Sequence, residues 1–364
     1  MLAAQTSRKV PLGSRNAPPT ALPPYADQVS RVPWRADQPA GKVCGDTMVG
    51  IPVDEILASS SAMRPQRAAA APRDPYAFID LARIGRTDWW SAAKGLLKIV
   101  FCYVLLSIAA AGAIILWRGV LPAGGFDVLA LLAVAAAWAL GLRGALKSQA
   151  RPFLSLISAE RRLRFGRCCL GAGLWLAVSL LWLVGGSLVS AMTTSTRSDA
   201  FLGHLSWPHG TLLIAAALCL ALIPLQAAGE ELVFRGWLTQ TLGQFLRSRP
   251  LLLLIVAAVF ALAHGSLHGR YAFPFYLVMS LGLSLLTLWD ERLELAIGIH
   301  TAQNVIAVIG GALFAASAGR ATLLFNAIQV PWWSALVPAA QFLVVYLIVA
   351  RLDRRRSPET AGSL

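Results

Sequence analysis

The chain has 364 residues, of which 57% are hydrophobic and only 14% are charged, and its mean hydropathy is +0.62. This apolar excess exceeds that of soluble domains and argues against an ordinary water-soluble fold. The net charge is +14, but the basic residues lie between apolar blocks. That is the pattern of membrane topology signals rather than of a nucleic-acid-binding surface. We therefore expect the lipid bilayer as a partner and no nucleic acid.

The N-terminal part differs in composition from the rest. Residues 1–75 contain 11 of the 20 prolines and no long periodic apolar run, which predicts a disordered, proline-rich tail. Residues 76–95 mix aromatic and basic side chains and are typical of a segment at the headgroup level, with Trp89 and Trp90 in the interface. We expect the folded domain over 76–352 and a basic cytoplasmic tail over 353–364.

Eight runs with few or no charges follow, most of them about as long as a helix that crosses the hydrocarbon core. In chain order the predicted spans are 99–117, 128–142, 168–192, 210–229, 250–269, 271–289, 295–319 and 331–350. Only helices and closed barrels satisfy their backbone hydrogen bonds in lipid. The runs therefore predict an all-α, polytopic membrane protein with about eight transmembrane helices.

Lys and Arg residues are distributed unevenly between the two sets of loops. If the chain from residue 83 onward begins on the cytoplasmic side, the inside segments carry 19 Lys and Arg and the outside loops carry 4. The positive-inside rule then predicts that both termini are cytoplasmic. The abundance of arginine and alanine is typical of a GC-rich bacterial genome, so we expect a multi-pass protein of the bacterial inner membrane.

In or beside three of the spans lie clusters of Glu, Arg, His and Asn side chains, which are costly in lipid unless they face a cavity or a partner. The six candidate site residues are Glu230, Glu231 and Arg235 at the end of the fourth span, His264 in the fifth, and His300 and Asn304 in the seventh. Their concentration predicts a functional site where these helices meet.

Helical geometry relates the candidates to one another. Glu231 and Arg235 are i,i+4 neighbours and can pair on one face, whereas Glu230 points about 100° away and is left free to react. A carboxylate beside a histidine can polarise a water and take its proton. His300 and Asn304 are also i,i+4 neighbours and can both donate to a developing oxyanion. The set therefore favours hydrolysis.

Three motifs carry the candidates in order on successive apolar helices: EELVFR at 230–235, FALAH at 260–264 and HTAQN at 300–304. This arrangement resembles the CAAX protease and bacteriocin-processing (CPBP) family, also called the Abi family, whose pattern is EExxxR, FxxxH and HxxxN. The resemblance covers roughly residues 76–352. It implies an intramembrane endopeptidase of the type II CAAX prenyl endopeptidase kind, whose eukaryotic members remove the last three residues of prenylated CAAX proteins.

The resemblance also implies roles for the six residues and a membrane-tethered protein or peptide as the substrate. The implied roles are general base for Glu230, positioning of the water for His264, an oxyanion hole for His300 and Asn304, and a supporting ion pair for Glu231 and Arg235. The family was long described as metalloproteases, so a zinc ion on Glu230, His264 and His300 is an alternative. The sequence contains no HExxH motif, and the favoured mechanism requires no cofactor.

Other interpretations stay open at this point. The Glu231–Arg235 pair would also suit a salt bridge at a helix end, and His264 a core histidine bonded to a carbonyl. The same residues fit a transporter or proton relay, or a non-catalytic scaffold or bacteriocin-immunity protein. A geometric problem also remains. His264 would lie about 21 Å along the fifth helix from Pro250, whereas Glu230 and His300 would lie near the cytoplasmic ends of theirs.

Overall fold

The computed structural model describes residues 77–117, 119–193, 210–246, 248–268, 272–318 and 335–356. The chain divides into two units, Met1–Arg67 and Ala68–Leu364, and all described residues belong to the second. The disordered tail predicted for 1–75 lies outside the described residues, as does most of the predicted C-terminal tail. Both stay predictions.

Each predicted span overlaps a helix, which confirms the all-α fold class for the described residues. The eight helices are α3 (Trp89–Trp117), α4 (Gly125–Gln149), α5 (Phe165–Thr193), α6 (Thr211–Glu231), α8 (Arg249–His268), α9 (Phe273–Asp290), α10 (Glu294–Ala318) and α11 (Leu336–Arg356). Short helical segments lie between them: α2 (Ala77–Asp80), η1 (Leu81–Ile84), η2 (Phe153–Leu156), η4 (Leu232–Leu238) and α7 (Thr239–Leu242).

Six of the helical stretches in the described residues are long and apolar enough to cross a membrane, and shorter apolar stretches occur in α8 and α11. Large apolar side chains cover their outer faces, as with Leu116, which is 81% exposed, and Leu181, which is 74% exposed. In a lipid environment such faces contact acyl chains rather than water. A polytopic membrane protein therefore accounts for both the helix lengths and the surface.

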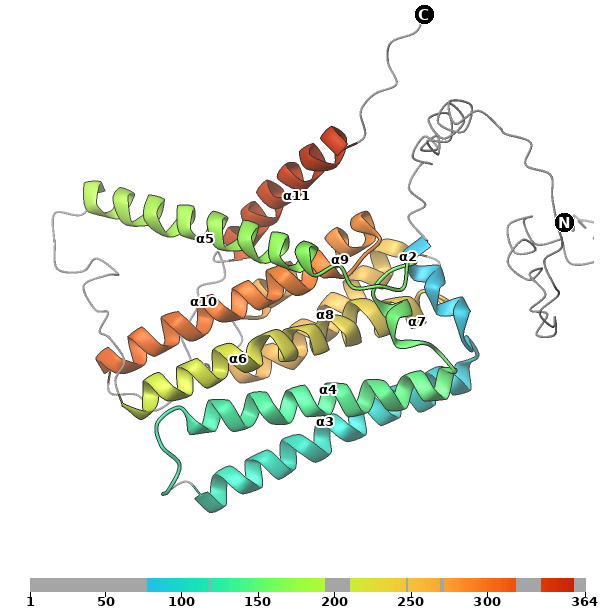
Figure 1. Ribbon diagram of the computed structural model, residues 1–364, viewed down its shortest axis with the longest axis horizontal. Helices are drawn as coiled ribbons and strands as arrows, with labels where there is room; N and C mark the ends of the chain where they lie inside the picture. Colours follow the sequence, from blue (N-terminus) through green and yellow to red (C-terminus); the bar gives the residue numbers. More distant parts are fainter. Residues whose placement is uncertain are drawn as a thin grey trace, which may run out of the picture. The chain divides into compact units, whose positions relative to one another are not determined.

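The helices form two layers around the candidate site. Helices α3, α4, α6, α10 and α5 are successive neighbours in one row, and α8, α9 and α11 form the other. Figure 1 shows α3, α4, α6 and α10 running side by side. Helices α8 and α9 pack on the segment after α6, and α9 also contacts α10. The motif-bearing helices α6, α8 and α10 therefore meet at the junction of the layers.

The helical stretch that begins with α6 does not end at Glu230 and Glu231, although the sequence predicts that the fourth span ends at residue 229. It continues through the π-helical segment η4 and through α7, so that the apolar helical stretch runs over Thr211–Leu242. Leu242 lies 12 residues beyond Glu230, about 18 Å along the axis, and His264 lies 15 residues, about 22 Å, after Arg249. The contacts resolve the geometric problem, because Glu230 Oε2 lies 3.7 Å from His264 Nε2 and 3.5 Å from His300 Nε2.

Helices α5 and α10 approach each other closely at two glycines. A Cβ atom on Gly298 would collide with the backbone carbonyl of Cys168, and one on Gly171 would collide with the backbone of Leu295. Side chains at either position would therefore force the helices apart. Gly298 precedes His300 by two residues, so this contact sets the position of the part of α10 that carries the site.

Candidate active site

A cavity of about 350 Å³ lies between α3, α4, α6 with η4, α8, α9 and α10. Most of its wall is apolar or aromatic, and four of the six candidate residues line it: Glu230, His264, His300 and Asn304. Glu231 and Arg235 are fully buried behind this wall. The structure therefore brings the six candidates together but divides them into a set that faces the cavity and a pair that does not.

Glu231 forms the centre of the buried pair. Its Oε1 accepts a hydrogen bond from Arg235 Nη1 at 2.7 Å and another from His300 Nδ1 at 2.7 Å. Both partners are almost entirely buried, so these charge-assisted bonds form away from water, where they are strong. The i,i+4 pairing predicted for Glu231 and Arg235 is present, but it lies in the interior and not at a helix end.

Arg235 is also held by side chains of the second layer of helices. Its Nη2 donates to Ser280 Oγ at 2.8 Å and to the Ser280 carbonyl at 3.3 Å, and its guanidinium carbon lies 4.5 Å from the centre of the Phe260 ring. Cation–π contact and hydrogen bonds together compensate part of the cost of burying the charge. The result is a fixed link from α6 to α8 and α9.

Glu230 faces two imidazoles across the cavity. Its Oε2 lies 3.7 Å from His264 Nε2 and 3.5 Å from His300 Nε2. The residue is only 4% exposed, and this oxygen makes no hydrogen bond to any residue in the described part of the chain. A buried acceptor without a protein donor needs water or a ligand group. Glu230 is thus placed to bind a molecule in the cavity.

His264 has a defined tautomer. Its Nδ1 lies 2.9 Å from the Phe260 carbonyl oxygen, which can only accept, so Nδ1 donates and Nε2 of the neutral ring is an acceptor. The ring stacks on Phe260 with centroids 4.2 Å apart and lies 4.8 Å from the Tyr276 ring. Its side chain keeps 21% exposure. The ring is therefore oriented by packing while its Nε2 faces Glu230.

Asn304 donates from Nδ2 to Gln226 Oε1 at 2.9 Å. Gln226 also lines the cavity, and it was missed from the sequence together with Ser280 and Tyr276. A signal for Gln226 was present, since it is a polar residue in an apolar span and lies one turn before Glu230 on the same helix face. Ser280 and Tyr276 carry no comparable signal, because hydroxyl groups are common in transmembrane helices.

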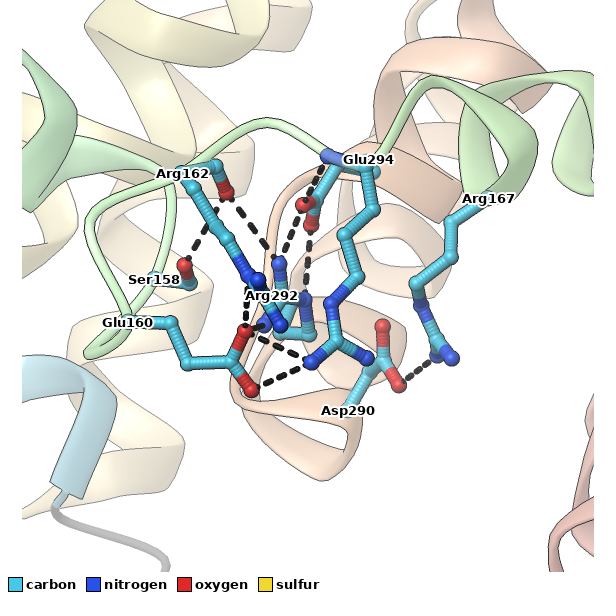
Figure 2. A network of polar contacts seen from close by, with 8 residues as sticks. Ser158, Glu160, Arg162, Arg167, Asp290, Arg292 and Glu294 are labelled. Atoms are coloured by element: carbon cyan, nitrogen blue, oxygen red, sulfur yellow. Dashed lines mark hydrogen bonds and ion pairs between the residues drawn. The ribbon is translucent and has the colours of Figure 1, made fainter.

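An ionic network outside the cavity holds the start of α10 (Figure 2). Glu294 is fully buried and accepts hydrogen bonds from the Arg164 backbone N–H at 3.1 Å and from Arg292 Nη2 at 2.5 Å. Arg292 also pairs with Glu160 at 3.3 Å and bonds the carbonyl of Arg162 at 3.2 Å. The connection between α4 and α5 is thereby fixed to the first turn of α10, six residues before His300.

Two further features of this network are electrostatic. The hydrogen bond from Arg162, together with those from Arg164, lowers the pKa of Glu160 to about 2 from its ordinary value of 4.5. Arg167 forms an ion pair with Asp290 at the end of α9. Glu160 therefore stays charged at neutral pH, and the Arg167–Asp290 pair links α5 to α9.

Zinc was the alternative for Glu230, His264 and His300. Among the described residues, no group of three or more His, Cys, Asp or Glu side chains converges in the manner of a metal site. Both the cofactor-free mechanism and the zinc alternative stay predictions.

Comparisons with known proteins agree with the motifs. Residues 211–306, which include all three motifs, match the family model described as type II CAAX prenyl endopeptidase Rce1-like. The chain is also 26% identical over 313 residues to the uncharacterized protein YyaK of Bacillus subtilis (strain 168), an alignment that covers 77% of this chain and 97% of that protein. No solved structure matches the chain. The family resemblance predicted from the motifs is thus confirmed over residues 211–306, which are similar to the Rce1-like type II CAAX prenyl endopeptidases.

Proposed function

We propose that this protein is an intramembrane endopeptidase that hydrolyses a peptide bond in a membrane-associated substrate, with water activated by Glu230 and His264. The observation that carries the proposal is the placement of Glu230 Oε2 within 3.7 Å of His264 Nε2 and 3.5 Å of His300 Nε2 in a buried cavity. The match to the Rce1-like family supports the reaction class.

The positioning of the water follows from the hydrogen-bond roles. Glu230 Oε2 and His264 Nε2 both accept, and they face each other across 3.7 Å. A water that lies to one side, within hydrogen-bond distance of both atoms, donates one proton to each, which leaves a lone pair on its oxygen for attack on a carbonyl carbon. The apolar wall of the cavity keeps other water away and strengthens these interactions.

In the proposed reaction, Glu230 carries one proton from the attacking water to the leaving nitrogen. Glu230 takes one proton from the water as the water oxygen bonds to the carbonyl carbon, and the carbonyl oxygen becomes an oxyanion. Glu230 next gives that proton to the leaving nitrogen, and the C–N bond breaks to yield a carboxyl product and an amine. Asn304 Nδ2 and His300 Nε2 are the proposed donors to the oxyanion.

His300 donates from both ring nitrogens in this mechanism. Its Nδ1 already donates to Glu231, so Nε2 can donate to an oxyanion only when the ring is an imidazolium. With that proton in place, the positive charges of His300 and Arg235 balance the negative charges of Glu230 and Glu231. A neutral cluster is the less costly arrangement for groups buried in a membrane protein.

Purified protein in lipid nanodiscs provides the test. Quenched-fluorescent peptides would carry a farnesylated cysteine fourth from the C-terminus, a fatty acyl chain, or a plain apolar helix, and mass spectrometry would locate the cut. We expect wild type to cleave at least one peptide, and Glu230→Gln and His264→Ala to abolish cleavage while remaining folded. Asp80→Asn, a surface carboxylate on α2, is the control and should keep activity.

The alternatives predict different results. A non-catalytic scaffold or an immunity protein would cleave no peptide in the panel, and cleavage that persists in Glu230→Gln would remove the proposed base. A transporter would move solutes into proteoliposomes in a manner that depends on the same residues. The bacterial inner membrane and the cytoplasmic position of both termini remain part of the proposal, and cysteine labelling from either side of intact cells tests them.

A further inference from the structure

Helices α6 and α10 run antiparallel, and two polar residues of one helix each contact a polar residue of the other. Gln226 and Glu230 are one turn apart on α6, and His300 and Asn304 are one turn apart on α10. Glu230 faces His300 at 3.5 Å, and Gln226 bonds Asn304 at 2.9 Å. The Gln226–Asn304 contact thus lies one helical turn from the contact between Glu230 and His300.

The hydrogen bond between these two amides fixes the orientation of the Asn304 carboxamide. An asparagine carboxamide has a broad, two-fold torsion preference, so its N–H edge and its oxygen edge can exchange places. The N–H edge stabilises an oxyanion, whereas the oxygen edge repels it. Because Nδ2 donates one proton to Gln226 Oε1, the other Nδ2 proton remains available to a group in the cavity.

Gln226 is suited to this role by its surroundings. It is only 6% exposed and lines the same cavity as Asn304. It lies among apolar residues of α6 and α4, including Ile223 and Leu131. In such an environment a hydrogen bond between two amides is stronger than in water, and breaking it leaves a buried polar group without a partner.

We propose that Gln226 is a positioning residue that orients the Asn304 amide as an oxyanion donor. The inference rests on the proposed peptidase function and extends it to a residue outside the three motifs. Gln226 acts through Asn304, so its loss should reduce the rate of the chemical step more than the affinity for substrate. The effect should also vanish when Asn304 is already absent.

A second buried glutamine gives a matched control. Gln341 on α11 is also 6% exposed, and its Nε2 donates to Ser179 Oγ on α5 at 3.0 Å. It joins two helices as Gln226 does, but it is not among the residues that line the cavity. Replacing each glutamine by methionine removes the amide at similar side-chain length. A purely structural role for Gln226 therefore predicts the same outcome for both variants.

The test is a double-mutant cycle of Gln226→Met and Asn304→Ala in nanodiscs, measured with whichever peptide of the panel wild type cleaves. We expect Gln226→Met to lower kcat by ~10- to 100-fold with KM nearly unchanged, and Asn304→Ala to lower kcat by about 10²- to 10³-fold, as for the loss of an oxyanion donor. The double variant should match Asn304→Ala. Gln341→Met should keep the wild-type kcat and lose only thermal stability.

Several results would overturn the inference. They are a wild-type kcat in Gln226→Met, a full additional loss from Gln226→Met in the Asn304→Ala background, or an equal loss of kcat in Gln341→Met. Melting temperatures of the same cycle report the hydrogen bond without reference to activity, and additive shifts there would show that the two amides are not coupled. If wild type cleaves no peptide, the proposed function fails and this inference fails with it.

Discussion

The same substitution, Glu→Gln, is expected to change the stability of the protein little at Glu230 and strongly at the adjacent Glu231. Glu231→Gln removes a fully buried carboxylate that accepts two charge-assisted hydrogen bonds at 2.7 Å, from Arg235 and from His300. A glutamine oxygen is a weaker acceptor, and its NH₂ group cannot accept at all. Arg235 would then be a buried cation without its counter-ion.

The magnitude follows from the burial of these groups. Breaking a buried ion pair by removing one partner costs about 3–5 kcal/mol. At about 2.1 cal/mol/K of unfolding entropy per residue, this cost would lower the melting temperature of a folded part of roughly 280 residues by about 5–9 °C. Glu230→Gln changes a side chain whose Oε2 has no hydrogen bond to a described residue and which faces the cavity, so we expect a stability change of at most about 1–2 kcal/mol.

The assay compares both variants with wild type by thermal unfolding in the same detergent and by peptide cleavage. Glu230→Gln should unfold near the wild-type temperature and be inactive, whereas Glu231→Gln should unfold well below it. Each variant is the control for the other, because the chemical change is identical and the positions are adjacent. Equal melting temperatures for the two variants would refute the division into a reacting carboxylate and a structural one.

Three further outcomes are expected. Gly298→Ala should lower both the melting temperature and kcat because the added Cβ collides with the α5 backbone, whereas Gly173→Ala on α5, where a Cβ meets nothing within 4 Å, should be neutral or slightly stabilising. Glu160, whose pKa is lowered to about 2 mainly by Arg162, contributes stability above pH 4.5 that is lost only as the pH falls towards 2; Glu160→Gln should remove that part of the melting-temperature profile. Prolonged dialysis against a strong chelator should leave cleavage unchanged, and a loss that zinc alone restores would establish the metal-dependent alternative.

The helices were predictable because each one contains a long run with few charges, and lipid allows such a run little else than a helix. Their ends were less predictable. The sequence predicts that the fourth span ends at residue 229, next to Glu230 and Glu231, yet the helical stretch continues to Leu242. The charges lie inside the protein, where Arg235 and His300 neutralise Glu231. Hydropathy cannot distinguish an interior ion pair from a helix end at the membrane surface.

The candidate site was predictable to the extent that it depends on spacing within one helix. The Glu231–Arg235 pair follows from i,i+4 geometry alone. Contacts between helices were not predictable from one sequence, because the register of two packed helices depends on close approaches such as that at Gly298. The Gln226–Asn304 bond and the contact of Arg235 with Ser280 belong to this class.

The arrangement of charges accounts for how hydrolytic groups can persist in an apolar environment. Arg235 and Glu231 form a fixed pair that is shielded from the cavity, and the carboxylate of that pair also holds His300 in place. Glu230 is adjacent in sequence but faces the cavity on the other side of His300. A proton taken up by Glu230 therefore changes the charge next to the substrate and leaves the buried pair intact. The proposed chemistry thus requires only one side chain of the cluster to change its protonation, while the others stabilise the position from which it reacts.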